Sequence, residues 1–137
     1  MKKLPHSLDF SHRHLYPSEK GITIPITLTS DISLSASLFP SLDTGSTYCV
    51  FERIYAQVLG LNLTSGIEEV ISTATGLFYY YGHELTLSVF GLEWQAIVYF
   101  AEPEAFSLNV IGRVGFLDRL RVGIVNYEQL VYLGLYE

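Results

Sequence analysis

One short polar sequence, Asp43-Thr44-Gly45, places a carboxyl group in a turn directly after the apolar segment 37–42. Two carboxyl groups held side by side can hydrolyse an amide bond. One of them stays neutral and donates a proton, while the other is ionised and takes a proton from the attacking water. Since this chain carries the sequence once, the second carboxyl group must come from another copy. Such chemistry therefore requires a homodimer.

The residues around Asp43 favour this use of the carboxyl group. Leu38, Phe39 and Leu42 are expected to supply an apolar setting, in which two neighbouring carboxyl groups share one proton. Gly45 leaves room for backbone N–H groups to approach the carboxylate, and the Thr44 hydroxyl can bond two paired turns together. The alternative is an ordinary turn after a strand, because Asp and Gly are common turn residues.

The composition indicates a folded, strand-rich domain. Hydrophobic residues make up 49% of the 137 residues and charged residues 16%, with 10 Tyr and 8 Phe, a mixture that favours strands over disorder. The net charge of −6 argues against a nucleic-acid partner, and no apolar run is long enough to span a membrane. The single Cys49 excludes an intrachain disulfide and suits a reducing compartment, so we expect a cytoplasmic protein.

The periodicity of the apolar residues predicts mostly β structure. Residues 1–20 are expected to form a polar, irregular N-terminal arm, and residues 21–137 the single domain, with regular structure beginning after Gly21. Pro25 predicts that the first strand lies at a sheet edge. The expected strands are 22–28, 32–38, 67–75, 77–90, 94–100, 119–125 and 129–135. A helix is expected over 51–59 with Gly60 as its cap, and a short one over 113–118.

A second motif, Asn109-Val110-Ile111-Gly112-Arg113, combines β-branched residues with a glycine in a tight crossing. Taken with Asp43-Thr44-Gly45 and the hairpin between the two motifs, it makes residues 22–133 resemble the retropepsin-like aspartic peptidases. The resemblance implies a mostly β fold: a closed or partly open β-barrel with one or two short helices and a flap hairpin. It also implies an aspartic endopeptidase that acts on peptides or proteins as a homodimer, without metal or cofactor.

The resemblance assigns roles to individual residues. Asp43 matches the catalytic aspartate, contributed once by each subunit, and Thr44 the residue whose hydroxyl bonds across the dimer axis. Gly45 matches a glycine that lines the substrate path. Ser46 matches a position where a hydroxyl can bond the ionised aspartate and lower the pKa values of the pair, which predicts an acid-shifted optimum. Residues Val110, Ile111, Gly112 and Arg113 match the structural support of the active site.

The segment 72–84 matches the flap, a hairpin that closes over bound peptide. Its expected substrate contacts are Thr75, Gly76, Leu77, Phe78 and Tyr79. The alternative is that the aromatic residues of this segment simply pack against a sheet face.

The chain departs from the retroviral pattern at two places. Thr47 stands where an aspartate commonly pairs with the arginine of the second motif, so Arg113 needs another partner. The terminal hairpin, residues 119–135, is longer than in the retroviral enzymes, which leaves the dimer interface open.

Two histidines and one cysteine outside the two motifs point to no competing chemistry. His12 and His14 lack the neighbouring ligands of a metal site, and Cys49 is expected to be a buried, inert thiol. Two other classes of protein stay open: a non-catalytic peptide-binding or dimerisation module of the same fold, and a small monomeric barrel that binds a ligand.

Overall fold

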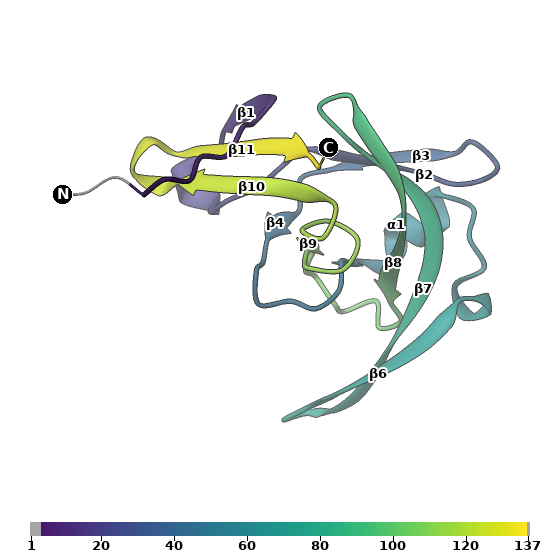
Figure 1. Cartoon of the computed structure of the whole chain (residues 1–137). Helices are drawn as coiled ribbons and strands as arrows, with labels where there is room; N and C mark the ends of the chain where they lie inside the picture. The colour runs from purple at the N-terminus through teal and green to yellow at the C-terminus, as the bar shows by residue number, and fades with distance from the viewer. Residues whose placement is uncertain (1–3, 137) are drawn as a thin grey trace.

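The computed structural model describes residues 4–136 and divides the strands between two sheets (Figure 1). The larger sheet has the order β3-β2-β7-β8-β5-β9-β4, with β6 paired to β7, and the smaller has the order β1-β11-β10. The strands are β1 (His12–Leu15), β2 (Ile26–Thr29), β3 (Ser35–Leu38), β4 (Ser41–Leu42), β5 (Val50–Phe51), β6 (Ile67–Thr73), β7 (Gly76–Val89), β8 (Leu92–Ala101), β9 (Val110–Ile111), β10 (Leu120–Val125) and β11 (Leu130–Leu135). The helices are α1 (Arg53–Val58) and the single 3₁₀ turns η1 (Ser18–Lys20), η2 (Leu63–Ser65) and η3 (Asn126–Glu128). The mostly β class predicted from the sequence is confirmed, although the described strands form no closed barrel.

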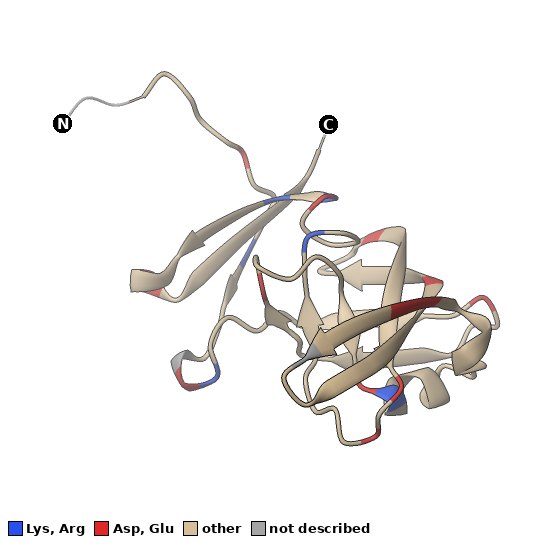
Figure 2. Ribbon diagram, turned by 90° about the horizontal axis from the view of Figure 1, so that it is seen from below, with Lys and Arg blue, Asp and Glu red and all other residues tan. Residues whose placement is uncertain are grey.

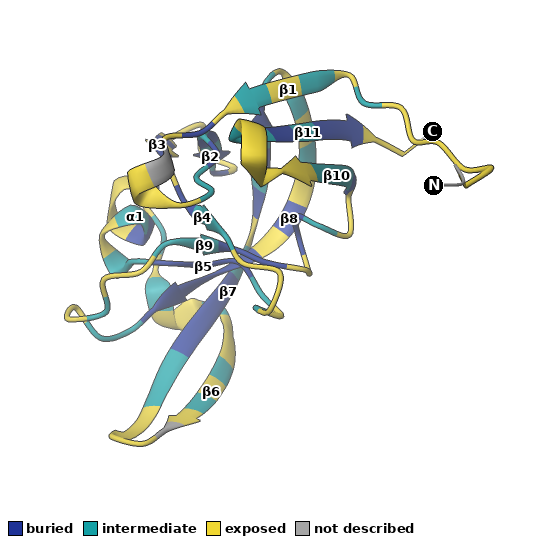
Figure 3. Cartoon of the chain, turned by 90° about the vertical axis from the view of Figure 1, so that its left-hand side faces the viewer, coloured by how far each residue is buried: buried dark blue, intermediate teal, exposed yellow. Residues whose placement is uncertain are grey.

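The antiparallel pair β7–β8 is the longest element of the larger sheet. Its register runs from Val89 opposite Leu92 to Tyr80 opposite Ala101. Beyond that pairing, β7 continues with β6 into a hairpin that extends away from the rest of the molecule (Figures 1 and 3). Buried residues alternate with more exposed ones at 84–89 in β7 and 95–98 in β8, as a period-2 pattern predicts, whereas 80–82 and 98–101 are buried without interruption. Fully buried side chains of the core include Phe51, Phe100, Phe116, Leu28, Leu87 and Leu133.

The smaller sheet joins the two ends of the chain, and it corrects the expectation that regular structure begins after Gly21. His12–Leu15 pairs with β11, from His12 opposite Leu133 to Leu15 opposite Leu130. This strand forms because β11 offers it a free edge, and because the rings of His12 and His14 pack beside Phe90 at the β7–β8 turn. The predicted long terminal hairpin is present as β10–β11. Residues 1–3 of the predicted arm lie outside the described residues, and the domain boundary stays a prediction.

Two further expectations about the elements were wrong. Strand β2 is not an edge strand, because it pairs with both β3 and β7; Pro25 precedes its first residue and so owes no hydrogen bond to the ladder. Residues 113–118 form successive turns instead of a helix. Gly115 adopts φ +99°, outside the helical range, which stops a helix from continuing there.

The helix predicted over 51–59 is present as the shorter α1. Gly60 follows it with φ +71° and donates its N–H to Gln57 O at 3.0 Å, as a C-terminal cap does. Within residues 4–136, no helix has the length and apolar character that crossing a bilayer demands. Among the described residues, Lys and Arg occur in β1, η1, α1, β10 and the turns before β10, and no strand of the larger sheet carries one, so they form no continuous basic stripe (Figure 2).

Candidate active site

Asp43 lies at the end of the two-residue strand β4, which is held by β9 in parallel register. Ser41 pairs with Val110 and Leu42 with Ile111. The Ser41 N–H donates to Asn109 O at 2.9 Å, and the Asp43 N–H donates to Ile111 O at 2.9 Å. The main chain of Asp43 is therefore fixed by the second sequence motif, although more than half the domain separates the two in sequence.

The turn after Asp43 directs backbone donors at its own aspartate. The Gly45 N–H donates to Asp43 Oδ1 at 2.9 Å, and the Ser46 N–H donates to Asp43 O at 3.1 Å. The bond from the Gly45 N–H to Asp43 Oδ1 is the close approach of a backbone N–H group that the sequence predicted at this glycine. Such a donor stabilises an ionised carboxylate. Asp43, Thr44 and Gly45 are all exposed in the single chain, and among the described residues Asp43 takes part in no ion pair.

Gly112 allows the second motif to lie against the first. A Cβ atom at this position would lie 2.5 Å from both Ser46 O and Tyr48 O, so no larger residue can be placed there without moving backbone. On either side of this close approach, the Arg113 N–H donates to Ser46 O at 2.9 Å and the Val114 N–H to Thr47 O at 2.8 Å. Residues 109–114 thereby hold the whole Asp43 turn in place.

Three expectations about this turn differ from the structure. The Ser46 hydroxyl donates its proton to Tyr48 O at 2.7 Å, so it is not available to the Asp43 carboxylate, and the basis for an acid-shifted optimum is missing. Leu38 points into the core, while Phe39 is 72% exposed, so the two do not enclose Asp43 in an apolar setting. Arg113 finds its partner in Thr47 itself, through a bond from Nη2 to Oγ1 at 3.2 Å.

Of the predicted substrate contacts, Thr75 lies in the turn of the β6–β7 hairpin, and Gly76 begins β7 with φ +130°. Leu77 is 62% exposed, whereas Phe78 and Tyr79 are half-buried. A hollow of about 280 Å³ lies between this end of the hairpin and the loop after β8, and its lining includes Leu77, Phe78 and Phe106.

An aromatic cluster that the sequence did not reveal continues from the hairpin toward the Asp43 turn. The ring of Phe106 lies 5.8 Å from that of Phe78 and 6.1 Å from that of Tyr80. Tyr99 belongs to the same small core, together with Val110 of β9, and its ring lies 4.5 Å from that of Tyr48. Burial raises the pKa of Tyr80 and Tyr99 above that of a free phenol.

The other reactive residues have structural roles. Cys49 is fully buried, and burial raises the pKa of its thiol from 9.0 to about 12, so it is a poor nucleophile. Its sulfur accepts the Gly112 N–H at 3.4 Å. No group of three or more His, Cys, Asp and Glu side chains within residues 4–136 is arranged to hold a metal.

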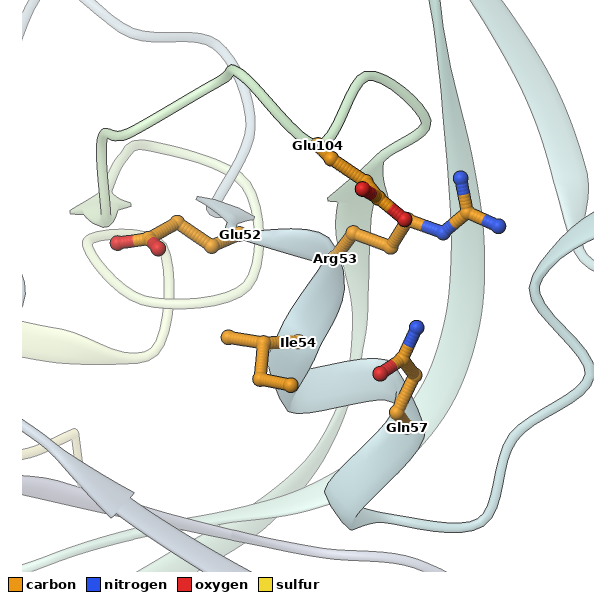
Figure 4. Close-up of a pocket in the computed structure, with 5 residues that line it drawn as sticks. All are labelled: Glu52, Arg53, Ile54, Gln57 and Glu104. Carbon is orange, nitrogen blue, oxygen red and sulfur yellow. The ribbon is translucent and has the colours of Figure 1, made fainter.

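A polar hollow of about 290 Å³ lies at the start of α1, away from Asp43 (Figure 4). Glu52, Arg53, Ile54, Gln57 and Glu104 line it. In Figure 4 the Glu52 carboxylate points to the opposite side from Arg53 and Glu104. There, Asn109 Nδ2 donates to Glu52 Oε1 at 2.7 Å and the Glu52 N–H donates to Asn109 Oδ1 at 3.0 Å. In the sequence, the one sign of the contact between Asn109 and Glu52 is that Asn109 belongs to the second motif.

The comparisons with known proteins identify the fold. No family model and no curated protein matches the sequence. Among solved structures, a retropepsin-like aspartic protease from Rickettsia conorii is 18% identical with a TM-score of 0.65, over 88% of this chain and 96% of that chain. EIAV protease, solved in complex with the inhibitor HBY-793, is 20% identical with a TM-score of 0.50, over 72% of this chain and 86% of that chain. The chain therefore has the retropepsin-like fold that its two motifs suggested.

Proposed function

We propose that this protein is an aspartic endopeptidase that acts as a homodimer, with one Asp43 from each subunit. The observation that carries the proposal is the geometry of the Asp43 turn. Its carboxylate is exposed and accepts the Gly45 N–H at 2.9 Å, on a main chain held by residues 109–114. The likeness in fold to two solved aspartic proteases supports the same reading.

The proposed reaction needs only the two carboxyl groups and water. The ionised Asp43 removes a proton from water as the water oxygen attacks the peptide carbonyl carbon, and the neutral Asp43 donates its proton to the carbonyl oxygen. The tetrahedral intermediate then collapses: the C–N bond breaks, the leaving nitrogen takes the proton that was removed from water, and a hydroxyl group of the intermediate returns its proton to the other Asp43 as the new carboxyl group forms. Two carboxyl groups held side by side in this way would share one proton and titrate as a pair. The Gly45 N–H stabilises whichever carboxylate is ionised.

The dimer follows from the incompleteness of the single chain. Asp43 and Thr44 are exposed at the outer surface of the turn, where the same turn of a second copy can approach. A carboxylate alone activates water but supplies no acid for the carbonyl oxygen, so a monomer lacks half of the chemistry.

The substrate is a peptide, and the wall of the proposed site is aromatic. The half-buried rings of Phe78 and Phe106 pack over the buried Tyr80 and form the wall that runs from the β6–β7 hairpin, which serves as the flap, toward Val110 beside the Asp43 turn. This surface favours apolar side chains next to the cleaved bond. A reducing compartment such as the cytoplasm suits the free, buried Cys49.

A cleavage assay with matched variants tests the proposal. The parent, Asp43→Asn and the control Asp31→Asn, which removes an exposed carboxylate in the β2–β3 turn, are incubated with a mixed peptide library from pH 3 to 8. Sedimentation velocity on the same samples measures the oligomeric state. We expect cleavage by the parent and the control, and a loss of about 1,000-fold or more in Asp43→Asn. A verified dimer that cleaves nothing refutes the enzyme and favours the peptide-binding module, and a stable monomer refutes both.

A further inference from the structure

The contact between Asn109 and Glu52 is a two-point clamp. The asparagine amide uses both of its polar atoms: Oδ1 accepts the Glu52 N–H at 3.0 Å, and Nδ2 donates to Glu52 Oε1 at 2.7 Å. The second bond is charge-assisted and short, which makes it the stronger of the two. Both residues are partly buried, so competition from water is reduced.

The clamp acts on the strand that carries Asp43. Asn109 directly precedes β9, and its own carbonyl oxygen accepts the Ser41 N–H at 2.9 Å. Strands β4 and β9 are each two residues long, so their pairing is marginal by itself and depends on how well each is anchored. The Asn109 side chain anchors β9 to Glu52, the residue directly before α1, and β9 in turn anchors β4 just before Asp43.

The charges near the clamp lie at the start of α1 and in the loop after β8. Arg53 follows Glu52 at the start of α1, and its Nη1 donates to Glu102 O at 3.1 Å, after β8. Glu104, in the same loop, lines the hollow on the other side of Glu52 (Figure 4). No ion pair to Glu52 is present in the described part of the chain, so the asparagine amide is the group that holds its carboxylate.

We propose that Asn109 is a positioning residue for catalysis, which clamps Glu52 and thereby holds the backbone of the Asp43 turn in its reactive place. The expected effect of Asn109 on peptide cleavage rests on the proposed function, whereas its effect on the backbone of the Asp43 turn does not. The side-chain bond of the clamp needs an amide that donates and a carboxylate that accepts. Two carboxylates at these positions would break it, and exchanging the amide and the carboxylate between the two positions would rebuild it.

The variants separate hydrogen bonding from bulk. Asn109→Leu keeps the size of the side chain and removes both bonds. Asn109→Asp keeps the acceptor but sets two carboxyl groups against each other, which costs most when both are ionised and least when they share a proton. Adding Glu52→Gln to Asn109→Asp restores a donor opposite an acceptor with the roles reversed. Glu52→Gln alone keeps an acceptor for the asparagine amide and is the matched control.

Two measurements are made on each variant. Amide hydrogen exchange follows the Ser41 and Asp43 N–H groups, with amides of the β7–β8 ladder as internal reference. In Asn109→Leu we expect the first two to exchange about 10-fold faster, the equivalent of one lost hydrogen bond, with the reference unchanged. Peptide cleavage gives kcat and KM from pH 4 to 7. We expect kcat of Asn109→Leu to fall roughly 10- to 100-fold with little change in KM.

The pH profile distinguishes a clamp from a general loss of structure. Relative to the parent, Asn109→Asp should lose most kcat at pH 7 and recover as the pH falls toward 4, and the double variant should recover at pH 7. The proposal is overturned if the Ser41 and Asp43 N–H groups of Asn109→Leu exchange at the parent's rate. It is also overturned if Asn109→Asp loses the same fraction of kcat at every pH and adding Glu52→Gln to it restores none of that loss. If the parent cleaves no peptide, the proposed function fails, and the exchange rates alone still decide whether the clamp holds the turn.

Discussion

Replacing Gly112 by alanine tests whether the two motifs hold each other in place. The added Cβ atom would lie 2.5 Å from Ser46 O, 2.5 Å from Tyr48 O and 3.0 Å from Tyr48 C. These are backbone atoms of the turn that follows Asp43, and they cannot swing away as a side chain can. To reach ordinary contact distances, the turn and the second motif must separate by several tenths of an ångström.

The cost follows from the bonds that such a separation breaks. Ser46 O accepts the Arg113 N–H at 2.9 Å, and Thr47 O accepts the Val114 N–H at 2.8 Å. Losing these two bonds costs about 0.5–1.5 kcal/mol each, and overfilling a packed region costs about 1–3 kcal/mol. We expect Gly112→Ala to lower the free energy of unfolding by about 3 kcal/mol. Because the displaced backbone carries Asp43, kcat should fall about 100-fold.

Urea unfolding and peptide cleavage measure the two effects, at one fixed protein concentration because the proposed dimerisation would add to apparent stability. Gly91→Ala is the control: its φ of +82° is strained for alanine, but an added Cβ would meet nothing within 4 Å. That variant should lose only about 1–2 kcal/mol and keep its activity. A Gly112→Ala protein with the parent's stability and cleavage rate would refute the reasoning.

Three further predictions concern other parts of the site. Thr47→Asp should set a carboxylate beside Arg113 and stabilise the protein by about 0.5 kcal/mol, with the gain vanishing in 1 M salt during thermal unfolding; a salt-independent result contradicts the pairing. Cys49 should resist thiol reagents at pH 8 in the native protein but react in urea. Because its pKa is about 12 when folded and 9.0 otherwise, it contributes stability that is complete below pH 9 and declines as the pH rises from 9 to 12; Cys49→Ala should lose that decline. Phe106→Ala removes a half-buried ring packed beside Phe78, so KM for peptides with apolar side chains should rise about 10-fold and the free energy of unfolding should fall by about 2 kcal/mol, less than for a fully buried ring; an unchanged KM would remove Phe106 from the substrate wall.

The elements that the sequence predicted well are those with a local cause. The alternation of apolar residues anticipated β7 and β8, and the Thr75-Gly76 pair anticipated the turn before them. The helix that ends before Gly60 was found in the same way. In each of these, the hydrogen-bonding pattern and the burial repeat with a period that a short stretch of sequence displays.

The predictions that failed depended on what a segment packs against. Pro25 suggested an edge strand, but β2 begins after it and is paired on both sides. Residues 12–15 are polar and unremarkable in sequence, yet they form a strand because β11 offers them an edge. The Ser46 hydroxyl was expected to face the aspartate, but a nearby carbonyl oxygen accepts its proton.

By itself, the sequence determined the residues on which the proposed chemistry rests: a single Asp43 in a Thr-Gly turn, from which the need for a second copy is inferred. It also determined which glycine would matter, since Gly112 stands inside a recognisable motif. The tertiary structure decided how that aspartate is held, through the parallel pairing of β4 with β9 and the clamp between Asn109 and Glu52. These contacts join residues far apart in the chain, and no local periodicity encodes them, because they form only after the packing of the whole domain has closed the loops between them.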